Sequence, residues 1–136
     1  PDKDIRREAW DVAKMTHITH PKRPLNWAEK LSIVCRAPDQ EIRREAWDIV
    51  QVQEKNANWF WQILNGILAE SPDSEIRQEA WDIRKEQLKK DIFGIEDIIF
   101  KCPDKRIKRE AKGIEKRFRG TLRKPFLHRL FGRGKK

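Results

Sequence analysis

The hydrophobic positions of the chain follow one pattern that occurs four times. The four segments align without gaps and begin at Pro1, Pro38, Pro72 and Pro103. They share Pro, Asp, Ile, Glu and Ala at matching positions, and the first three also share a Trp-Asp pair. In each copy an isoleucine, an alanine and a second aliphatic residue stand at i, i+4 and i+7. This spacing is typical of an α-helix with one buried face, so each copy is predicted to form such a helix.

The start of each copy carries a signal for the beginning of a helix. Proline suits the first helical residue because the N–H that it lacks would be unpaired there, and the aspartate that follows favours the positive end of the helix dipole. Further apolar helices are predicted between the copies. One opens at Asn26 with a capping pattern, and others cover residues 59–68 and 92–99. Residues 15–24, with two prolines and two histidines, are predicted to form an irregular loop.

A helix pair that cannot bury its own apolar face has to stack on its neighbours, which gives an α-solenoid. We therefore predict an all-α fold, a right-handed α-α superhelix of about three and a half helix-pair repeats. The repeat domain is expected to cover residues 1–118. Residues 119–136 are expected to form a basic amphipathic tail or cap.

The repeated core Pro-Asp-x-x-Ile-Arg-x-x-Ala-x-x-Ile resembles the second helix of HEAT repeats, in particular of the short HEAT-like type. The resemblance implies a curved scaffold of the HEAT/armadillo kind that binds protein or nucleic acid, and it implies no chemistry. One departure counts against the Asp–Arg ladder between repeats of many family members: Ala37, Ser71 and Cys102 replace the aspartate often found five residues before the aliphatic position. In this register the chain starts at a second helix. A first helix is then expected upstream of Pro1, or that edge is exposed.

In HEAT-like solenoids the second helices line the concave surface. A step of about 100° per residue puts Arg7, Trp10 and Asp11 opposite the buried face of their helix. The expected partner-binding face consists of Arg7, Trp10, Asp11, Arg44, Trp47, Asp48, Gln78, Trp81 and Asp82. Tryptophan is costly to expose, so two explanations stay open. The favoured one is packing of the indoles between repeats, and the other is a groove in which Trp and Arg anchor a peptide or nucleic acid.

The C-terminal end of the chain is strongly basic. The 136 residues have a net charge of +9, yet residues 101–136 contain 15 basic against 3 acidic residues. Such a density attracts phosphate polyanions through counterion release, without base specificity. The predicted nucleic-acid-binding residues are Lys105, Arg106, Lys108, Arg109, Lys112, Lys116, Arg117, Arg119, Arg123, Lys124, Arg129, Arg133, Lys135 and Lys136. A solvated end without a ligand is one alternative. An anionic membrane surface entered by the apolar residues of 126–131 is a less favoured one, because those residues more naturally cap the last repeat.

The remaining candidates for chemistry are weak. His17 and His20 have the spacing of metal ligands but no Cys or carboxylate at a matching distance, so no metal and no cofactor are expected. Cys35 and Cys102 are expected to be small core residues with free thiols, which favours a reducing, intracellular and most naturally cytoplasmic location. Mean hydropathy is −0.89, and no apolar run has the length of a membrane span. No phosphate loop or nucleophile motif is present, which favours a protein that is not an enzyme.

The sequence therefore predicts a non-catalytic HEAT-like scaffold. Its concave face binds a protein partner, and its basic C-terminal segment binds an anionic partner, with nucleic acid the first candidate. A pure protein–protein adaptor with an incidental tail is one alternative. A HEAT-like DNA alkylpurine glycosylase is another, because that class uses Trp, Asp and Arg in a concave groove. A Trp-Asp pair that occurs three times argues against one unique catalytic constellation.

Overall fold

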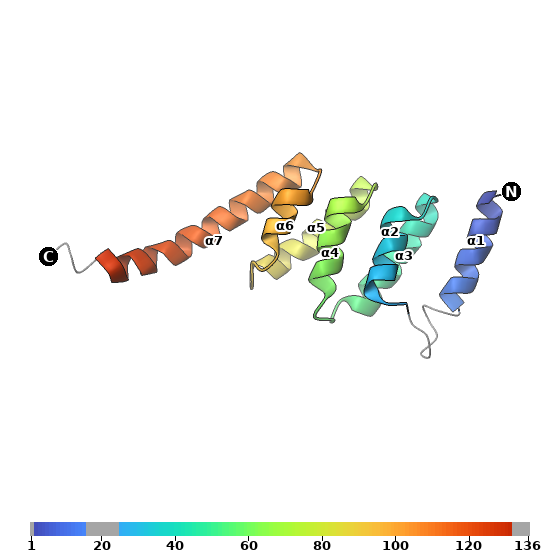
Figure 1. Ribbon diagram of the computed structural model, residues 1–136, viewed down its shortest axis with the longest axis horizontal. Coiled ribbons are helices and arrows are strands. Elements are labelled where there is room, and N and C mark those ends of the chain that lie inside the picture. Colours follow the sequence, from blue (N-terminus) through green and yellow to red (C-terminus); the bar gives the residue numbers. More distant parts are fainter. Residues whose placement is uncertain (1, 16–24, 132–136) are drawn as a thin grey trace.

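The computed structural model describes residues 2–15 and 25–131, and their side chains as far as Gly120. Every regular element in these ranges is helical, which confirms the all-α prediction. The helices are α1 (Asp2–Ala13), α2 (Trp27–Arg36), α3 (Gln40–Glu54), α4 (Phe60–Glu70), α5 (Ser74–Leu88), α6 (Ile95–Lys101) and α7 (Lys105–Phe131). Figure 1 shows them as a row of helices with the N-terminal end on the right and α7 projecting to the left.

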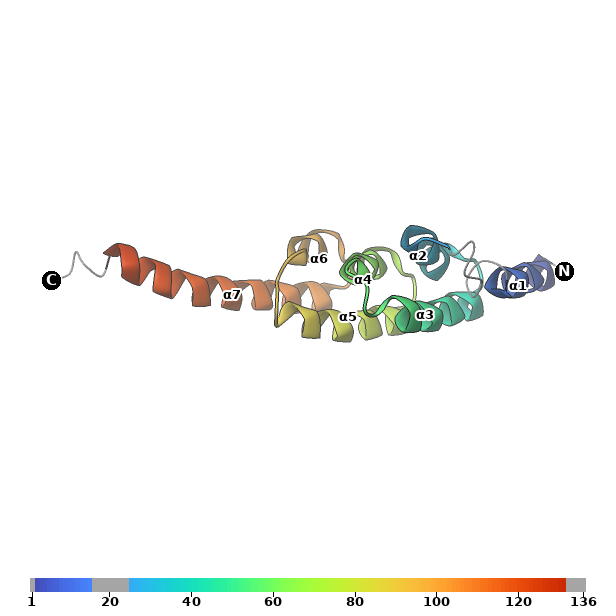
Figure 2. The same ribbon diagram turned by 90° about the horizontal axis from the view of Figure 1, so that it is seen from below.

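The helices are arranged as pairs in two layers. α2 packs on α3, α4 on α5 and α6 on α7, and α4 also contacts both α2 and α6. Figure 2 shows α2, α4 and α6 in one layer and α3, α5 and the first half of α7 in the other, with α1 beside α3. This pairing follows from the apolar stripes, because each helix covers the stripe of its partner. The right-handed superhelix stays a prediction.

The predicted buried stripe is confirmed in three of the four copies. Ile42, Ile76 and Ile107 are buried, as are the alanines four residues after each, and the second aliphatic residues are half-buried against the same core. In the first copy the prediction is wrong, since Ile5 is 65% exposed and Ala9 is also exposed. The reason is the pairing of helices. Among the described residues, α1 has no first-layer helix of its own to cover its stripe.

The helix starts differ by two residues from the prediction. α3, α5 and α7 begin at Gln40, Ser74 and Lys105, so each proline lies before its helix and not at the first helical residue. Asp39 and Asp73 are the N-cap residues in extended conformation, but neither side chain caps its helix. The capping pattern at Asn26 is confirmed, because its side chain accepts a hydrogen bond of 2.8 Å from the backbone N–H of Glu29.

An Asp–Arg ladder joins consecutive repeats. Arg6 donates two hydrogen bonds to Asp39, with Nε 2.7 Å from Oδ2, and Arg43 makes the same pair to Asp73 at 2.8 Å. The argument against such a ladder is therefore wrong. The carboxylates come from the Pro-Asp dipeptide of the next repeat and not from the family position occupied by Ala37 and Ser71. Bidentate pairs of this kind fix orientation as well as distance.

The ladder predicts a stability difference between two arginine substitutions. Arg43→Leu leaves Asp73, whose side chain is only 8% exposed, without its cation, and is expected to lower the free energy of unfolding by about 3 kcal/mol. Arg36→Leu removes an exposed pair with Glu70 and is expected to change it by less than about 0.5 kcal/mol. Urea unfolding of both variants measures this. An equal decrease in the free energy of unfolding for the two variants would contradict a structural role for the ladder.

Candidate functional site

The three tryptophans of the expected partner-binding face are buried. Trp47 and Trp81 are 0% exposed, and Trp10 is buried as well, so these indoles do not form a row on the surface. Trp47 donates from Nε1 to Glu79 at 3.4 Å, and Trp81 donates to Glu110 at 3.1 Å. Each acceptor belongs to the next repeat, which confirms packing between repeats for these two residues. The angle of a side chain on its own helix cannot show what a neighbouring helix covers.

The arginines of the same face form a second ladder between repeats. Arg7 donates two hydrogen bonds to Glu45, and Arg44 donates two to Glu79, one of them at 3.0 Å. Lys14 adds a third donor to Glu45 at 3.0 Å. These partners hold the pKa values of both glutamates below their ordinary range, chiefly through the arginine hydrogen bonds. The guanidinium groups are thus partly committed inside the fold.

The polar remainder of the face is also paired within its own helices. Asp11 lies 3.4 Å from Arg7, and Asp48 lies 3.3 Å from Arg44. Gln78 replaces the arginine in the third copy and donates to Asp82 at 2.9 Å. The polar part of the predicted face is therefore engaged in ion pairs and hydrogen bonds within the fold. Its free hydrogen-bonding capacity is smaller than the sequence indicated.

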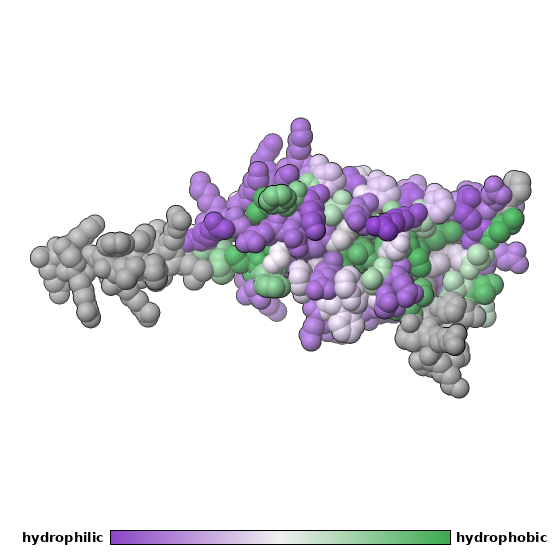
Figure 3. Space-filling model, viewed as in Figure 1, coloured by the Kyte–Doolittle hydropathy of each residue, from purple (hydrophilic) through white to green (hydrophobic). Residues whose placement is uncertain are grey.

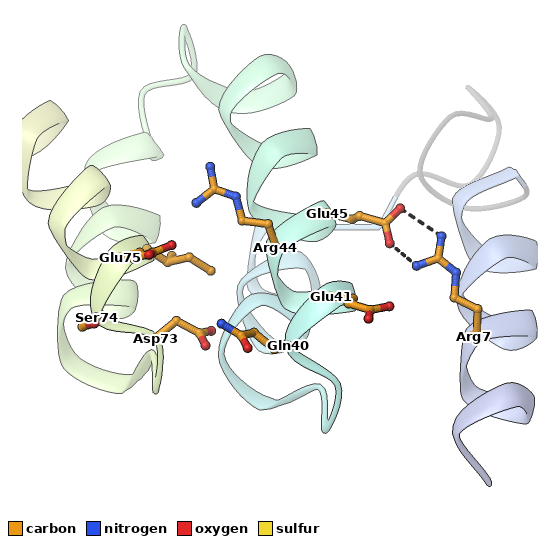
Figure 4. A pocket seen from close by; sticks show the side chains of 9 residues that line it. Arg7, Gln40, Glu41, Arg44, Glu45, Asp73, Ser74 and Glu75 are labelled. Atoms are coloured by element: carbon orange, nitrogen blue, oxygen red, sulfur yellow. Dashed lines mark hydrogen bonds and ion pairs between the residues drawn. The ribbon is translucent and has the colours of Figure 1, made fainter. Parts of the chain in front are cut away.

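A hollow of about 630 Å³ lies on this side of the molecule, between the starts of α3 and α5. Figure 4 shows Arg7 turned towards Glu45 at one side of it and Arg44 near its centre. Its lining has four acidic and two basic residues and consists of Arg7, Gln40, Glu41, Arg44, Glu45, Asp73, Ser74, Glu75 and Ile76. Sequence reasoning missed Gln40, Ser74 and the two acidic residues that follow them. They belong to helix starts whose polar residues vary between copies.

The basic residues of α7 form a second surface. Lys105, Arg109, Lys112, Lys116 and Arg119 are all exposed, and their spacing puts them on one helix face over about 20 Å at 1.5 Å per residue. Among the described residues, the first four lie in no ion pair, whereas Arg119 lies 3.6 Å from Glu115. Figure 3 shows polar side chains standing out from this end of the molecule. The face points away from the stripe of Ile107 and Ala111, which is buried against the repeats.

The other predicted cations of this segment divide into two groups. Arg106 is exposed but donates to Gln78 and Glu110, Lys108 is half-buried, and Arg117 is exposed. The side chains of the rest lie outside the described residues: Arg123, Lys124, Arg129, Arg133, Lys135 and Lys136. The same holds for the apolar residues of 126–131, on which the membrane alternative rests. The structure thus describes the side chains of eight of the fourteen predicted residues, all on α7.

Arg84 is a buried residue that the sequence did not single out. Arg84 is 2% exposed and donates to Asn65 at 2.9 Å, to Gln87 and to the carbonyl oxygen of Phe93. Burial lowers its pKa to about 10. It holds the turn at Gly94, which has a φ of 83° and lies so close to Trp61 that a Cβ there would be 2.7 Å from the ring. Arg84 stands at a position that varies among the copies, so the repeat pattern gave no signal for it.

Three further expectations concern metals, thiols and membranes. His17 and His20 lie outside the described residues, and among the described ones no group of three or more His, Cys, Asp or Glu could hold a metal ion. Cys35 and Cys102 are free and buried as expected, and burial raises the pKa of Cys35 to about 12. Within residues 2–15 and 25–131, no helix combines the length and apolar character needed to cross a membrane.

No protein-family model, curated protein or solved structure matches this chain. The resemblance to HEAT-like repeats therefore stays a hypothesis that rests on the repeated motif itself.

The second ladder predicts a dependence of stability on pH. The pKa of Glu79 is lower in the folded state than its ordinary value of 4.5, so the unfolded state binds more protons in acid. The stabilisation is complete above pH 4.5 and is lost as the pH falls through the lowered value. Arg44→Gln removes the main cause. Urea unfolding is expected to show a difference in the free energy of unfolding between native and variant protein, and this difference is larger at neutral pH than in acid.

The control for this comparison is Arg109→Gln, which removes an exposed cation that has no ion pair among the described residues. The free energy of unfolding of this variant is expected to differ little from that of the native protein at every pH. A gap for Arg44→Gln that stays constant from neutral to acid pH would contradict the assigned cause.

Proposed function

We propose that this chain is a non-catalytic, HEAT-like repeat scaffold whose last helix binds the phosphate backbone of a nucleic acid. One observation supports this most directly: Lys105, Arg109, Lys112 and Lys116 share an exposed face of α7, and no ion pair in the described part of the chain engages them. Four cations that make no ion pair among the described residues, on one helix face, give a strong local field because their charges add.

The geometry favours a backbone contact over base reading. The face contains charged side chains without Asn or Gln, the residues that read adenine, and without an aromatic side chain on which a base could stack. A straight row of cations about 20 Å long, at about 1.5 Å per residue, follows several successive phosphates. The proposed interaction is therefore independent of sequence and strongly dependent on salt.

The expected partner-binding face has a smaller role in this proposal. Arg7 and Arg44 are bound to Glu45 and Glu79, and the tryptophans are buried, so anchors of the predicted kind are absent from this described surface. The hollow between α3 and α5 supports a second candidate, an adaptor that binds a protein with a basic segment there. Its lining includes four carboxylates and two cations. Both cations are paired, as are Glu45 and Asp73 among the carboxylates, which leaves Glu41 and Glu75 as the carboxylates without a hydrogen-bonded arginine. The glycosylase alternative rests on the Trp-Asp pairs as groove residues, and Trp10, Trp47 and Trp81 of these pairs are buried.

The proposal predicts the outcome of a salt titration with a labelled duplex of about 20 base pairs and a single strand of the same length. The triple variant Arg109→Gln, Lys112→Gln, Lys116→Gln removes three cations of the face. It is expected to weaken binding and to lower the slope of log K against log salt by about 0.9 for each duplex phosphate that is no longer neutralised. Fluorescence anisotropy measures both quantities.

The matched control is the triple variant Lys55→Gln, Lys89→Gln, Lys90→Gln, which removes the same charge from exposed positions outside α7. This variant is expected to keep nearly the native slope. An equal loss of affinity in the two triple variants would show that only the net charge matters, and would contradict the assigned face. A native chain that binds neither nucleic acid would favour the adaptor.

A further inference from the structure

A second hollow, of about 560 Å³, opens beside the turn at Gly94. Three aromatic rings contribute to its wall: Trp61 of α4, Phe93 of the turn and Phe118 of α7. Phe93 stands edge-on to Trp61, with the ring centroids 5.2 Å apart and the ring planes at 83°. Phe93 is 66% exposed and Phe118 is 37% exposed. Exposed rings that line one concave surface indicate a binding site rather than a core. This site is called the aromatic hollow below.

The charged lining of the aromatic hollow is acidic. It consists of Asp91, Glu96 and Asp97, all exposed, and no basic residue is among the described residues that line it. Asp91 accepts a hydrogen bond of 3.0 Å from the backbone N–H of Phe93. Burial lowers the pKa of the nearby Arg84, and the charge of Asp91 partly offsets this effect. Asp91 therefore serves the turn. Glu96 and Asp97 make no ion pair among the described residues, so their charges are available to a cationic ligand.

The fold itself shows how a guanidinium group is held by these two kinds of contact. The guanidinium of Arg84 lies 5.7 Å from the ring centroid of Trp61. In the Asp–Arg ladder, Arg6 and Arg43 each bind an aspartate through two hydrogen bonds. A guanidinium combines attraction to an aromatic face with several N–H donors for carboxylates. A quaternary ammonium has no N–H group and would leave the carboxylates without a donor.

We propose that the aromatic hollow binds an arginine side chain of a protein partner. The guanidinium group lies against the rings of Trp61 and Phe93 and donates to Glu96 and Asp97. The aliphatic stem of the arginine packs on Ile92, which is half-buried in the same lining. The proposal is independent of nucleic-acid binding by α7, because the carboxylates of the aromatic hollow repel a polyanion.

NMR titration of the full chain with short peptides tests the proposal. The peptides are identical except for the central residue, which is arginine, lysine, trimethyllysine or citrulline, the uncharged isostere of arginine. The arginine peptide is expected to shift the amide signals of residues 91–97. It is expected to bind roughly tenfold more tightly than the citrulline peptide, which lacks charge-assisted hydrogen bonds. The lysine peptide is expected to bind less tightly than the arginine peptide, because an ammonium has fewer donors and is more strongly hydrated.

Three outcomes of this titration would overturn the proposal. Equal binding of the arginine and citrulline peptides would exclude recognition of the charge. Tighter binding of the trimethyllysine peptide would assign the hollow to quaternary ammonium groups. Shifts confined to residues 40–45 and 73–76 would place the peptide in the hollow between α3 and α5.

A change of one aromatic residue locates the site. Phe93→Ala removes one wall of the aromatic hollow and is expected to weaken binding of the arginine peptide by roughly fivefold or more. The matched control is Phe100→Ala, which changes a phenylalanine of α6 that is 86% exposed and lies outside the lining. This control is expected to bind like the native chain. Because both side chains are mainly exposed, both variants should keep the native thermal midpoint. Native-like binding by Phe93→Ala would overturn the proposal.

A change of charge gives an independent readout. Asp97→Asn keeps the shape of the side chain and is expected to weaken the arginine peptide while leaving the citrulline peptide unchanged. The control Asp4→Asn removes the same charge from an exposed position of α1 and is expected to change neither. An equal effect of the two variants would overturn the role of Asp97. Sedimentation equilibrium identifies another source of the arginine: a native dimer that Phe93→Ala converts to a monomer would show that a second copy supplies it, and would overturn a separate partner.

Discussion

Each helix of the second layer has an apolar stripe that it cannot bury alone, and the rest of the structure depends on this constraint. Where a first-layer helix covers the stripe, as α4 covers α5, the isoleucine and the alanine are buried and the pair joins the continuous core. Where no such helix is described, as at α1, the same residues are exposed. The stability of each helix thus depends on the helices that pack against it.

The charged residues of the repeat follow the same logic. In the middle, Asp39, Asp73, Glu45 and Glu79 bind the arginines of the preceding repeat, so charges that look available in the sequence are occupied. In the described residues of α1, Asp2 and Glu8 make no ion pair, and on α7 the described Lys105, Arg109, Lys112 and Lys116 make none either. The contacts within the fold therefore leave a basic face on α7. The proposal of nucleic-acid binding arises from this face.

The sequence predicts the helices and the core of the complete repeats well, because the spacing of Ile42, Ala46 and their equivalents records burial directly. It fails where a property depends on the next repeat. The helical angle of Trp47 indicates an exposed flank of its own helix, yet α5 supplies the Glu79 that binds it. At the position where HEAT-like repeats often have the ladder aspartate, this chain has Ala37, which argues against a ladder. Asp39 nevertheless forms one with Arg6. Arg84 gives no signal at all, since it serves one particular turn and not the repeat.

Native-state hydrogen exchange of the full chain tests most directly whether neighbours stabilise each helix. α4 and α5 have partners on both sides, so the account predicts the slowest exchange there and the fastest in α1, with α3 between them. The gradient should follow position in the array, although α1, α3 and α5 share nearly the same sequence pattern. Protection of α1 equal to that of α5 would contradict the account.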